Sequence, residues 1–505
     1  MESVKFKQVV IAILGFILLG AFVVVGYVES MRRIPDAKPR IVVSAENEKC
    51  LNCHEQQSNA RTVAQQWRES THAKRGVGCL ECHEAEASDA DSFTHYTETI
   101  ATVVTPGDCS RCHPAEFEQF QRSHHADAGN ILGSLDNVLA EVIEGHMPVV
   151  HGKRLASPAA VSGCKQCHGS VVTPLLDENG DKTYRDSGVL VLDHNTWPNT
   201  GIGRLNPDGT KGSCAACHNR HYFSAAQARE PDDCGKCHLG PDHPQYEIYR
   251  ESKHGINFIA HKDKMNLDAQ PWIVGEDYVA APTCASCHMS ATPNQPVTHD
   301  VGERISWTLR PPISEKVDAV ALKQGKDVMP WKERRANMTD VCVQCHSQQF
   351  VGSFYKQYDD LVNLYNDKFG RPATDIIKSL KSNDLITGDI AFDDKIEWTY
   401  FYLWHHEGRR ARMGAAMMGP DYTQWHGMFE VADRFYMEFV PEAREAVEHG
   451  RESGKQAGAD AAQDVIDKIM ARDEHLWIQG KMSDEERAAR EAASDAFRKR
   501  YAGSE

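Results

Sequence analysis

The sequence predicts a mainly α-helical protein, and three observations support that fold class. A Cys-x-x-Cys-His unit occurs eight times and uses all 16 cysteines of the 505-residue chain. Joints rich in proline and glycine, such as residues 203–213 and 239–245, separate these units and favour short helices over strands. The chain after the last unit has no cysteine and carries apolar residues at helical spacing. We therefore expect short helices first and long helices behind them.

Composition and charge exclude two broad classes of protein. Hydrophobic residues make up 41% of the chain and aromatic residues 8%, enough to bury a core, which excludes an intrinsically disordered protein. The formal net charge is −16, and a protein of this charge is repelled by the phosphates of DNA and RNA. We expect no nucleic-acid partner.

The eight Cys-x-x-Cys-His units are typical of c-type haem attachment. Two thiols on one tight turn add to the two vinyl groups of a haem, and the histidine that follows coordinates the iron. Zinc sites and disulfides also use paired cysteines, but neither requires a histidine directly after every pair. We therefore predict a mainly α multihaem cytochrome c with eight covalently bound haems. The attachment residues are Cys50, Cys53, His54, Cys79, Cys82, His83, Cys109, Cys112, His113, Cys164, Cys167, His168, Cys214, Cys217, His218, Cys234, Cys237, His238, Cys284, Cys287, His288, Cys342, Cys345 and His346.

The composition divides the chain into four predicted segments. Residues 9–28 carry no charge and are long enough to span a bilayer, so residues 1–29 are expected to form an uncleaved N-terminal transmembrane anchor. Residues 30–49 are expected to be a linker, residues 50–346 an octahaem cytochrome c domain, and residues 347–505 a C-terminal helical bundle. Because c-type haems are attached outside the bacterial cytoplasm, we expect the protein at the periplasmic face of the cytoplasmic membrane.

Two segments of the predicted bundle show clear helical signals. Apolar residues recur at helical spacing through residues 425–439, beginning at Trp425 and ending at Phe439. Residues 483–501 have helix-forming composition with charges on all sides. Packing and oligomerisation suffice to explain most of this bundle.

A second pattern recurs three times and predicts distal haem ligands. An aromatic residue lies five positions before a histidine, a serine lies two positions before it, and a small residue follows it. A small residue behind the imidazole lets the ring approach a flat macrocycle closely. The three histidines are His72, His125 and His254, and their aromatic partners are Trp67, Phe120 and Tyr249.

Four more histidines complete the predicted set of iron ligands on weaker grounds, because a lone histidine is often only a hydrogen-bonded residue. His221 lies three residues after His218 and is expected to serve a neighbouring haem rather than its own. The other three are His95, His243 and His299. The chain has 25 histidines, enough to ligate every iron twice, so their number does not identify an open haem.

Three longer blocks resemble the octahaem hydroxylamine oxidoreductase family. They are GRLNPDGTKGSCAACHNRHYFS at residues 203–224, CHLGPDHPQYEIYRESKHG at 237–255 and WHHEGRRARMGAAMMGPDYTQWHG at 404–427. The resemblance implies a homotrimer with seven bis-histidine electron-transfer haems, and a C-terminal bundle that completes the active site. It also implies one catalytic haem with an open distal face, the fourth in sequence, which Cys164, Cys167 and His168 hold here. The implied activity is oxidation of hydroxylamine to nitric oxide or nitrite.

The resemblance further implies catalytic residues. The family's distal Asp-His pair matches Asp193 and His194, for which a plain pair in a loop is the alternative. A distal tyrosine of the family matches either Tyr246 or Tyr249. Oxidative members link a tyrosine of a neighbouring subunit covalently to the catalytic haem. Tyr422 is the best candidate for that crosslink, although packing in the bundle explains it equally well.

The direction of catalysis is left open by these residues. Members without the tyrosine link resemble reductases that convert nitrite or hydroxylamine towards ammonium, and a non-enzymatic, membrane-anchored electron conduit is a third alternative. The expected partners are a small nitrogen-oxide or hydroxylamine substrate and a redox partner, either a cytochrome or a quinone-linked membrane protein.

Overall fold

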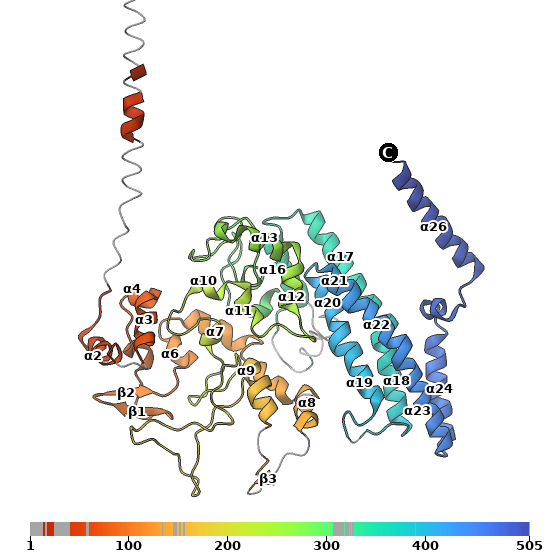
Figure 1. Ribbon diagram of the computed structural model, residues 1–505, viewed down its shortest axis with the longest axis horizontal. Helices are drawn as coiled ribbons and strands as arrows, with labels where there is room; N and C mark the ends of the chain where they lie inside the picture. Colours follow the sequence, from red (N-terminus) through yellow and green to blue (C-terminus); the bar gives the residue numbers. More distant parts are fainter. Residues whose placement is uncertain are drawn as a thin grey trace, which may run out of the picture. The chain divides into compact units, whose positions relative to one another are not determined.

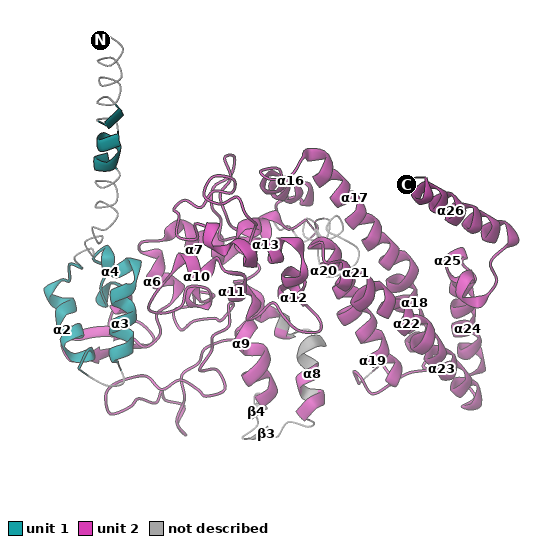
Figure 2. Ribbon diagram, turned by 45° about the horizontal axis from the view of Figure 1, so that its top comes forward, with its two compact units in different colours: residues 1–81 teal, residues 82–505 magenta. Residues whose placement is uncertain are grey.

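The computed structural model describes residues 14–15, 18–24, 41–56, 60–133, 135–144, 149–150, 153–154, 157–306, 318, 323, 325, 328–388 and 390–503. The described chain is mostly helical (Figure 1), which confirms the predicted fold class. It forms two compact units, residues 1–81 and residues 82–505 (Figure 2). The boundary falls inside the second Cys-x-x-Cys-His unit.

The first unit is built from short helices around one buried aromatic residue. The helices are α2 Ala45–His54, α3 Arg61–Glu69 and α4 Thr71–Lys74, and α5 Leu80–His83 runs across the unit boundary. Trp67 is buried, and its indole Nε1 donates to the Val77 carbonyl at 2.9 Å. Ser70 separates α3 from α4, and its hydroxyl accepts from the Ala73 amide at 3.0 Å. The serine of the predicted distal-ligand pattern therefore caps the turn that carries the histidine.

The same capping arrangement recurs in the second unit at the helix that carries His254. Ser252 ends α12 and begins α13, and its hydroxyl accepts from the Gly255 amide at 3.2 Å. Gly255 is buried, and a Cβ there would lie 2.0 Å from the Tyr249 carbonyl oxygen. Gly255 is therefore required by the close approach of the two helices.

The cysteine-rich part of the second unit consists of short elements. Its helices are α6 Pro106–Ser110, α7 Pro114–Arg122, α8 Leu135–Glu144, α9 Lys165–His168, α10 Ala225–Ala228, α11 Pro231–Gly235, α12 Gln245–Glu251, α13 Lys253–His261, α14 Cys284–His288 and α16 Trp331–Cys342, with 3₁₀ turns at Ala128–Gly133, Cys214–Ala216, Lys262–Lys264 and Val301–Arg304 and a π turn at Ala160–Cys164. Strands in the described residues form two antiparallel pairs, β1 Ser92–His95 with β2 Glu98–Ala101 and β3 Val149–Val150 with β4 Lys153–Arg154. The expectation of few strands is met.

The C-terminal part is the predicted helical bundle. Its helices are α17 Gln348–Tyr365, α18 Arg371–Ser382, α19 Lys395–Phe401, α20 Gly408–Ala416, α21 Pro420–Thr423, α22 Glu430–Asp433, α23 Val440–Glu452, α24 Gln456–Met470, α25 Asp473–Leu476 and α26 Asp484–Ala502. Between them lie π turns at Asn366–Gly370, Tyr402–Glu407, Gln424–Phe429 and Arg434–Phe439 and a 3₁₀ turn at Trp477–Gln479.

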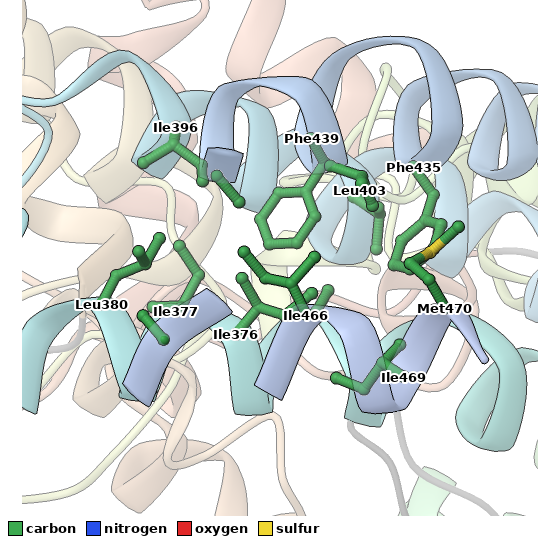
Figure 3. Close-up of a cluster of buried hydrophobic side chains, with 14 of the residues drawn as sticks. Ile376, Ile377, Leu380, Ile396, Leu403, Phe435, Phe439, Ile466, Ile469 and Met470 are labelled. Carbon is green, nitrogen blue, oxygen red and sulfur yellow. The ribbon is translucent and has the colours of Figure 1, made fainter. Parts of the chain in front are cut away.

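One apolar cluster forms the core of the bundle. Ile376 of α18, Phe435 and Phe439 of the π turn before α23, and Ile466 of α24 interdigitate (Figure 3). By contrast, Trp425 is 57% exposed although the sequence places it in the same helical pattern. Each π turn adds a residue to a helical turn, so residues at regular 3.6-residue spacing do not all stay on the buried face.

Truncating the centre of this core is expected to destabilise the bundle strongly. Phe435 is fully buried, so Phe435→Ala removes its contacts and leaves a cavity that costs about 3–5 kcal/mol. Thermal unfolding followed by circular dichroism should show a lowered midpoint. Phe497→Ala on α26, where the ring is 62% exposed, is the control and should change stability by no more than about 0.5 kcal/mol. If the two substitutions lowered the unfolding midpoint equally, Phe435 would not lie in the core of the bundle.

The prediction of a single N-terminal membrane anchor, and of the periplasmic membrane face that depends on it, is contradicted. Within the described part of the chain, no helix is both long enough and apolar enough to cross a bilayer. Of the predicted span, only residues 14–15 and 18–24 are described, as helix, and the remainder lies outside the described residues.

Candidate haem and redox site

The Cys-x-x-Cys-His units lie on single helical turns. The seventh unit is the whole of α14 Cys284–His288, and Thr283 caps it by accepting from the Ser286 amide. The fourth unit begins in a π turn and ends in α9 Lys165–His168. Residues three and four positions apart share one face of a helix, so two thiols and an imidazole can meet the same macrocycle.

Four histidines of these units each face a second histidine at the separation expected for a haem iron between them. An imidazole nitrogen bonds a metal at about 2 Å, so ligands on opposite sides of one iron have ring centres about 6 Å apart. The observed pairs are His83 and His221 at 6.4 Å, His218 and His299 at 6.5 Å, His125 and His238 at 6.1 Å, and His254 and His346 at 6.1 Å. Each pair joins one unit to one predicted distal ligand, so these residues fit a bis-histidine haem.

The protonation of these histidines also suits metal binding. Burial lowers the pKa of His125, His218 and His221 to about 4. The rings are therefore neutral near pH 7, and a neutral imidazole keeps one nitrogen lone pair for a metal.

His243, another predicted ligand, has its ring centre 6.5 Å from that of His238, so His238 faces both His125 and His243. The other predicted ligands lie as follows. His54 ends α2 and His72 lies in α4 of the first unit, while His95 ends β1 with its ring 4.9 Å from Tyr96. His113 lies 3.9 Å from the Glu116 carboxylate. His288 is the last residue of α14.

The fourth and sixth units lie against each other. The side chains of Cys167 and Cys237 lie close enough to interact, and so do those of His238 and His168. The Nδ1 atom of His168 lies 3.2 Å from the Ala128 carbonyl oxygen. A proton on Nδ1 shared with that carbonyl leaves the Nε2 lone pair for an iron. The chain that follows the sixth unit therefore runs next to the fourth.

An aspartate–histidine pair, Asp242 and His243, lies on the chain that follows the sixth unit. His243 Nδ1 donates to Asp242 Oδ1 in a short hydrogen bond, and His243 Nε2 lies 3.0 Å from the Cys237 carbonyl oxygen. Both ring nitrogens thus face acceptors. The ring of His243 lies 6.5 Å from that of His238, and His243 is also close enough to Cys167 to interact with its charge, so the pair lies near both the sixth and the fourth units.

Two basic side chains of the bundle, those of Arg409 and His405, lie near the Asp242 carboxylate. Arg409 Nη1 lies 3.5 Å and His405 Nδ1 lies 3.8 Å from Asp242 Oδ2. Burial alone would raise the pKa of Asp242, but the hydrogen bond and charge of His243 and the charges of His405 and Arg409 outweigh it and lower the pKa to about 2. Burial also lowers the pKa of His243, but its bond to Asp242 outweighs that effect and raises the pKa.

The predicted pair Asp193 and His194 has a different environment. Asp193 Oδ1 accepts from the backbone and side-chain nitrogens of Asn195 at 2.9 and 3.0 Å, which closes a loop turn. The side chain of His194 is 85% exposed, and its Nδ1 lies 3.7 Å from Asp193 Oδ1. Asp193 therefore forms a turn, and Lys165 of the fourth unit lies close enough to interact with its charge and donates to the Asn195 carbonyl at 3.3 Å.

The three predicted tyrosines occupy distinct positions. Tyr249 is buried, and its hydroxyl donates to the Pro282 carbonyl at 3.0 Å, next to the seventh unit. The hydroxyl of Tyr246 donates to Asp232 at 2.5 Å. Tyr422 is half-buried on α21, with its ring 5.2 Å from that of His426. Burial and the charges of nearby carboxylates raise the pKa of Tyr422.

Asp242, His405 and Arg409 have no role among the sequence-based expectations, and His243 is expected there only as an iron ligand. All four lie in the blocks at 237–255 and 404–427 that carry the family resemblance. The sequence signal for this pair is a second Asp-His dipeptide, which begins four residues after the last residue of the sixth unit. Its link to Arg409 joins positions 167 residues apart, which no local spacing reveals.

Comparisons with known proteins point to a multihaem cytochrome c. A family model for seven-fold multi-haem cytochrome CxxCH matches residues 207–392, and one for cytochrome c554 and c-prime matches residues 29–84. A probable nitrite reductase–hydroxylamine oxidoreductase fusion protein of Kuenenia stuttgartiensis is 26% identical over 352 residues, covering 64% of this chain. The match spans only 37% of that protein's length.

Two solved structures share the fold. One, a hypothetical multiheme protein, aligns with a TM-score of 0.67 and 26% identity over 82% of this chain and 98% of its own. The other, from a reducing HAO-like protein complex of Kuenenia stuttgartiensis, aligns with a TM-score of 0.55 and 19% identity over 81% and 86% of the two chains.

Proposed function

We propose that this chain, which is similar to multihaem c-type cytochromes and to hydroxylamine-oxidoreductase-like proteins, oxidises hydroxylamine to nitric oxide or nitrite. The catalytic haem is the one held by Cys164, Cys167 and His168, and seven bis-histidine haems carry the electrons away. The observation that carries the proposal is the Asp242–His243 pair, which lies beside the fourth unit.

The paired histidines support the electron-transfer part of the proposal. Four described histidine pairs have the separation of two ligands on one iron, and each combines a Cys-x-x-Cys-His unit with a distal histidine. Iron with two histidine ligands has no position for a substrate and exchanges electrons only. A chain of such haems can accept several electrons from one substrate molecule.

The acid–base chemistry falls to this chain's own residues. Oxidising hydroxylamine to nitric oxide releases three electrons and three protons, so a proton acceptor beside the iron is required. The haem supplies the binding position for the substrate nitrogen and takes the electrons. Asp242 fixes the His243 ring by accepting from Nδ1, and the Nε2 atom of that ring is the proton-exchanging atom. In this proposal His125 is the partner of His238, and His243 is an acid–base residue rather than an iron ligand. One of the seven bis-histidine haems then takes its distal ligand from a histidine outside the predicted set.

The assignment of the catalytic pair is tested by making the same substitution at two aspartates, Asp242 and Asp193, which have different surroundings. Asp242→Asn removes the charge that orients His243, and we expect the turnover of hydroxylamine with an artificial electron acceptor to fall by about 10²- to 10³-fold. Asp193→Asn changes a turn residue by the same chemistry and should leave turnover within about twofold. The opposite ranking would favour Asp193 and His194 as the catalytic pair and overturn our assignment.

A reductive activity is the second candidate, and one observation favours it. Both nitrogens of His243 face acceptors, so the ring is placed to carry two protons and to donate one. Reduction of nitrite or hydroxylamine to ammonium consumes protons, and a cationic imidazole is a suitable donor. Assays of one preparation in both directions separate the two activities. Activity in neither direction would leave a non-enzymatic electron conduit as the function.

The proposed assembly is a homotrimer that works with a separate redox protein. Trp425, Phe429 and Met437 are 57%, 52% and 59% exposed on the haem-free bundle, and Tyr422 lies on the same run of helix. Large apolar side chains exposed together are typical of a protein–protein interface. We infer that this face meets a neighbouring subunit and brings Tyr422 towards its catalytic haem.

A further inference from the structure

Arg409 connects the haem-free bundle to the candidate catalytic pair. It lies in α20, directly after the π turn Tyr402–Glu407, and its Nη1 is 3.5 Å from Asp242 Oδ2. The residue is 7% exposed, and its guanidinium lies 5.3 Å above the Trp404 ring. A buried arginine is costly unless a carboxylate or an aromatic face compensates it, and here both are present.

The two oxygens of Asp242 divide their partners between two parts of the chain. Oδ1 accepts from His243, on its own loop, whereas Oδ2 faces Arg409 and His405, which belong to the bundle. The loop that carries the pair is followed at once by α12 Gln245–Glu251, which packs against α20. The Asp242 carboxylate is therefore the polar link between the loop and the bundle.

From this arrangement we propose that Arg409 is a positioning residue, which holds the Asp242 carboxylate so that Asp242 in turn fixes the His243 ring. The catalytic relevance of this role rests on the proposed function. Arg409 touches neither substrate nor iron and acts through Asp242. Partners of this outer kind typically contribute 10- to 100-fold, about the effect of misplacing a ligand or a base.

Arg410 provides a matched control on the same helix. Its Nη2 donates to Glu430 Oε2 at 2.7 Å, inside the bundle and away from Asp242. Arg409→Gln and Arg410→Gln therefore each remove one arginine–carboxylate contact from adjacent positions of α20. A purely structural role of Arg409 predicts similar behaviour of the two variants.

The first readout does not depend on turnover. Diethyl pyrocarbonate modifies accessible imidazoles, and peptide mass spectrometry measures its rate at His243 in the haem-loaded, full-length protein. We expect the rate to rise about tenfold in Arg409→Gln, to be largely restored in Arg409→Lys, and to stay at the wild-type value in Arg410→Gln. An unchanged rate in Arg409→Gln would overturn the proposal.

The second readout tests the consequence for catalysis. With hydroxylamine and an artificial acceptor, kcat of Arg409→Gln should fall about 10- to 100-fold while KM stays within about twofold, because the substrate contacts remain. Increased labelling with unchanged kcat would overturn the catalytic part alone. Increased labelling of His243 in Arg409→Gln, combined with a wild-type protein that shows neither oxidative nor reductive turnover, would support the positioning role and reject the proposed function.

Discussion

Replacing both cysteines of the fourth unit, Cys164→Ser with Cys167→Ser, is expected to remove the only haem that binds an external ligand. Carbon monoxide binds ferrous haem where one axial position lacks a protein ligand, and the proposed haem of His168 is the one with such a position. Wild-type protein should therefore bind one carbon monoxide per chain after reduction. The double variant should bind none, lose the mass of one haem, and lose turnover to the background rate.

The eighth unit supplies the control for this experiment. Its His346 faces His254 with ring centres 6.1 Å apart, which fits a haem iron with two protein ligands. Cys342→Ser with Cys345→Ser should also lose the mass of one haem but still bind one carbon monoxide per chain. Carbon monoxide binding that persists in the fourth-unit variant would place the open position at another haem and contradict our assignment. Intact-mass measurement of the wild type checks the proposed total of eight haems.

Most of the fold follows from short-range features of the sequence. The Cys-x-x-Cys-His units predict their own helical turns, and the serine of the distal-ligand pattern caps the following helix, as Ser70 and Ser252 show. Helical periodicity predicted the bundle but not its exact core. Phe435 is buried and Trp425 is exposed, because π turns shift the face that the periodicity assumes. Those turns have no recognisable sequence signature.

The candidate site was predicted less completely, because its contacts are long-range. Motif spacing located the histidines of each unit, and the repeated pattern selected His125 and His254, which lie opposite His238 and His346. The choice between two Asp-His dipeptides could not be made from sequence. The contact of Cys167 with Cys237 brings Asp242 and His243 to the fourth unit, whereas Asp193 closes a loop turn.

The two parts of the proposed site, the Asp242–His243 pair and the tyrosine of the crosslink, meet on one helical segment. Arg409 of α20 contacts Asp242, and Tyr422 follows on α21, which packs against α20. π turns lie directly before and after this segment, and such turns often occur at functional sites. A substitution at Arg409 is therefore expected to shift the position of Tyr422 as well, because α20 packs against α21.

Tyr422→Phe is expected to separate the two directions of catalysis. In the proposed trimer, Tyr422 bonds to the catalytic haem of the neighbouring subunit, and the resemblance implies that this bond favours electron withdrawal. Its phenol is accessible to a neighbour because the ring is only half-buried among exposed side chains such as Trp425. Without the hydroxyl, hydroxylamine oxidation should fall by about two orders of magnitude, the size of one lost catalytic interaction, while the reductive activity persists.

Peptide mass spectrometry measures the crosslink directly. Digested wild-type protein should yield one species that contains the haem, the Cys164–Cys167 peptide and the Tyr422 peptide, and Tyr422→Phe should yield the two peptides apart. Tyr501→Phe, on the exposed face of α26, changes a tyrosine of the same bundle and should leave both the crosslinked species and the oxidative rate unchanged. If the wild-type peptides are already separate and reduction exceeds oxidation, then Tyr422 only packs in the bundle. The reductive alternative would then be the function, with His243 acting as the proton donor.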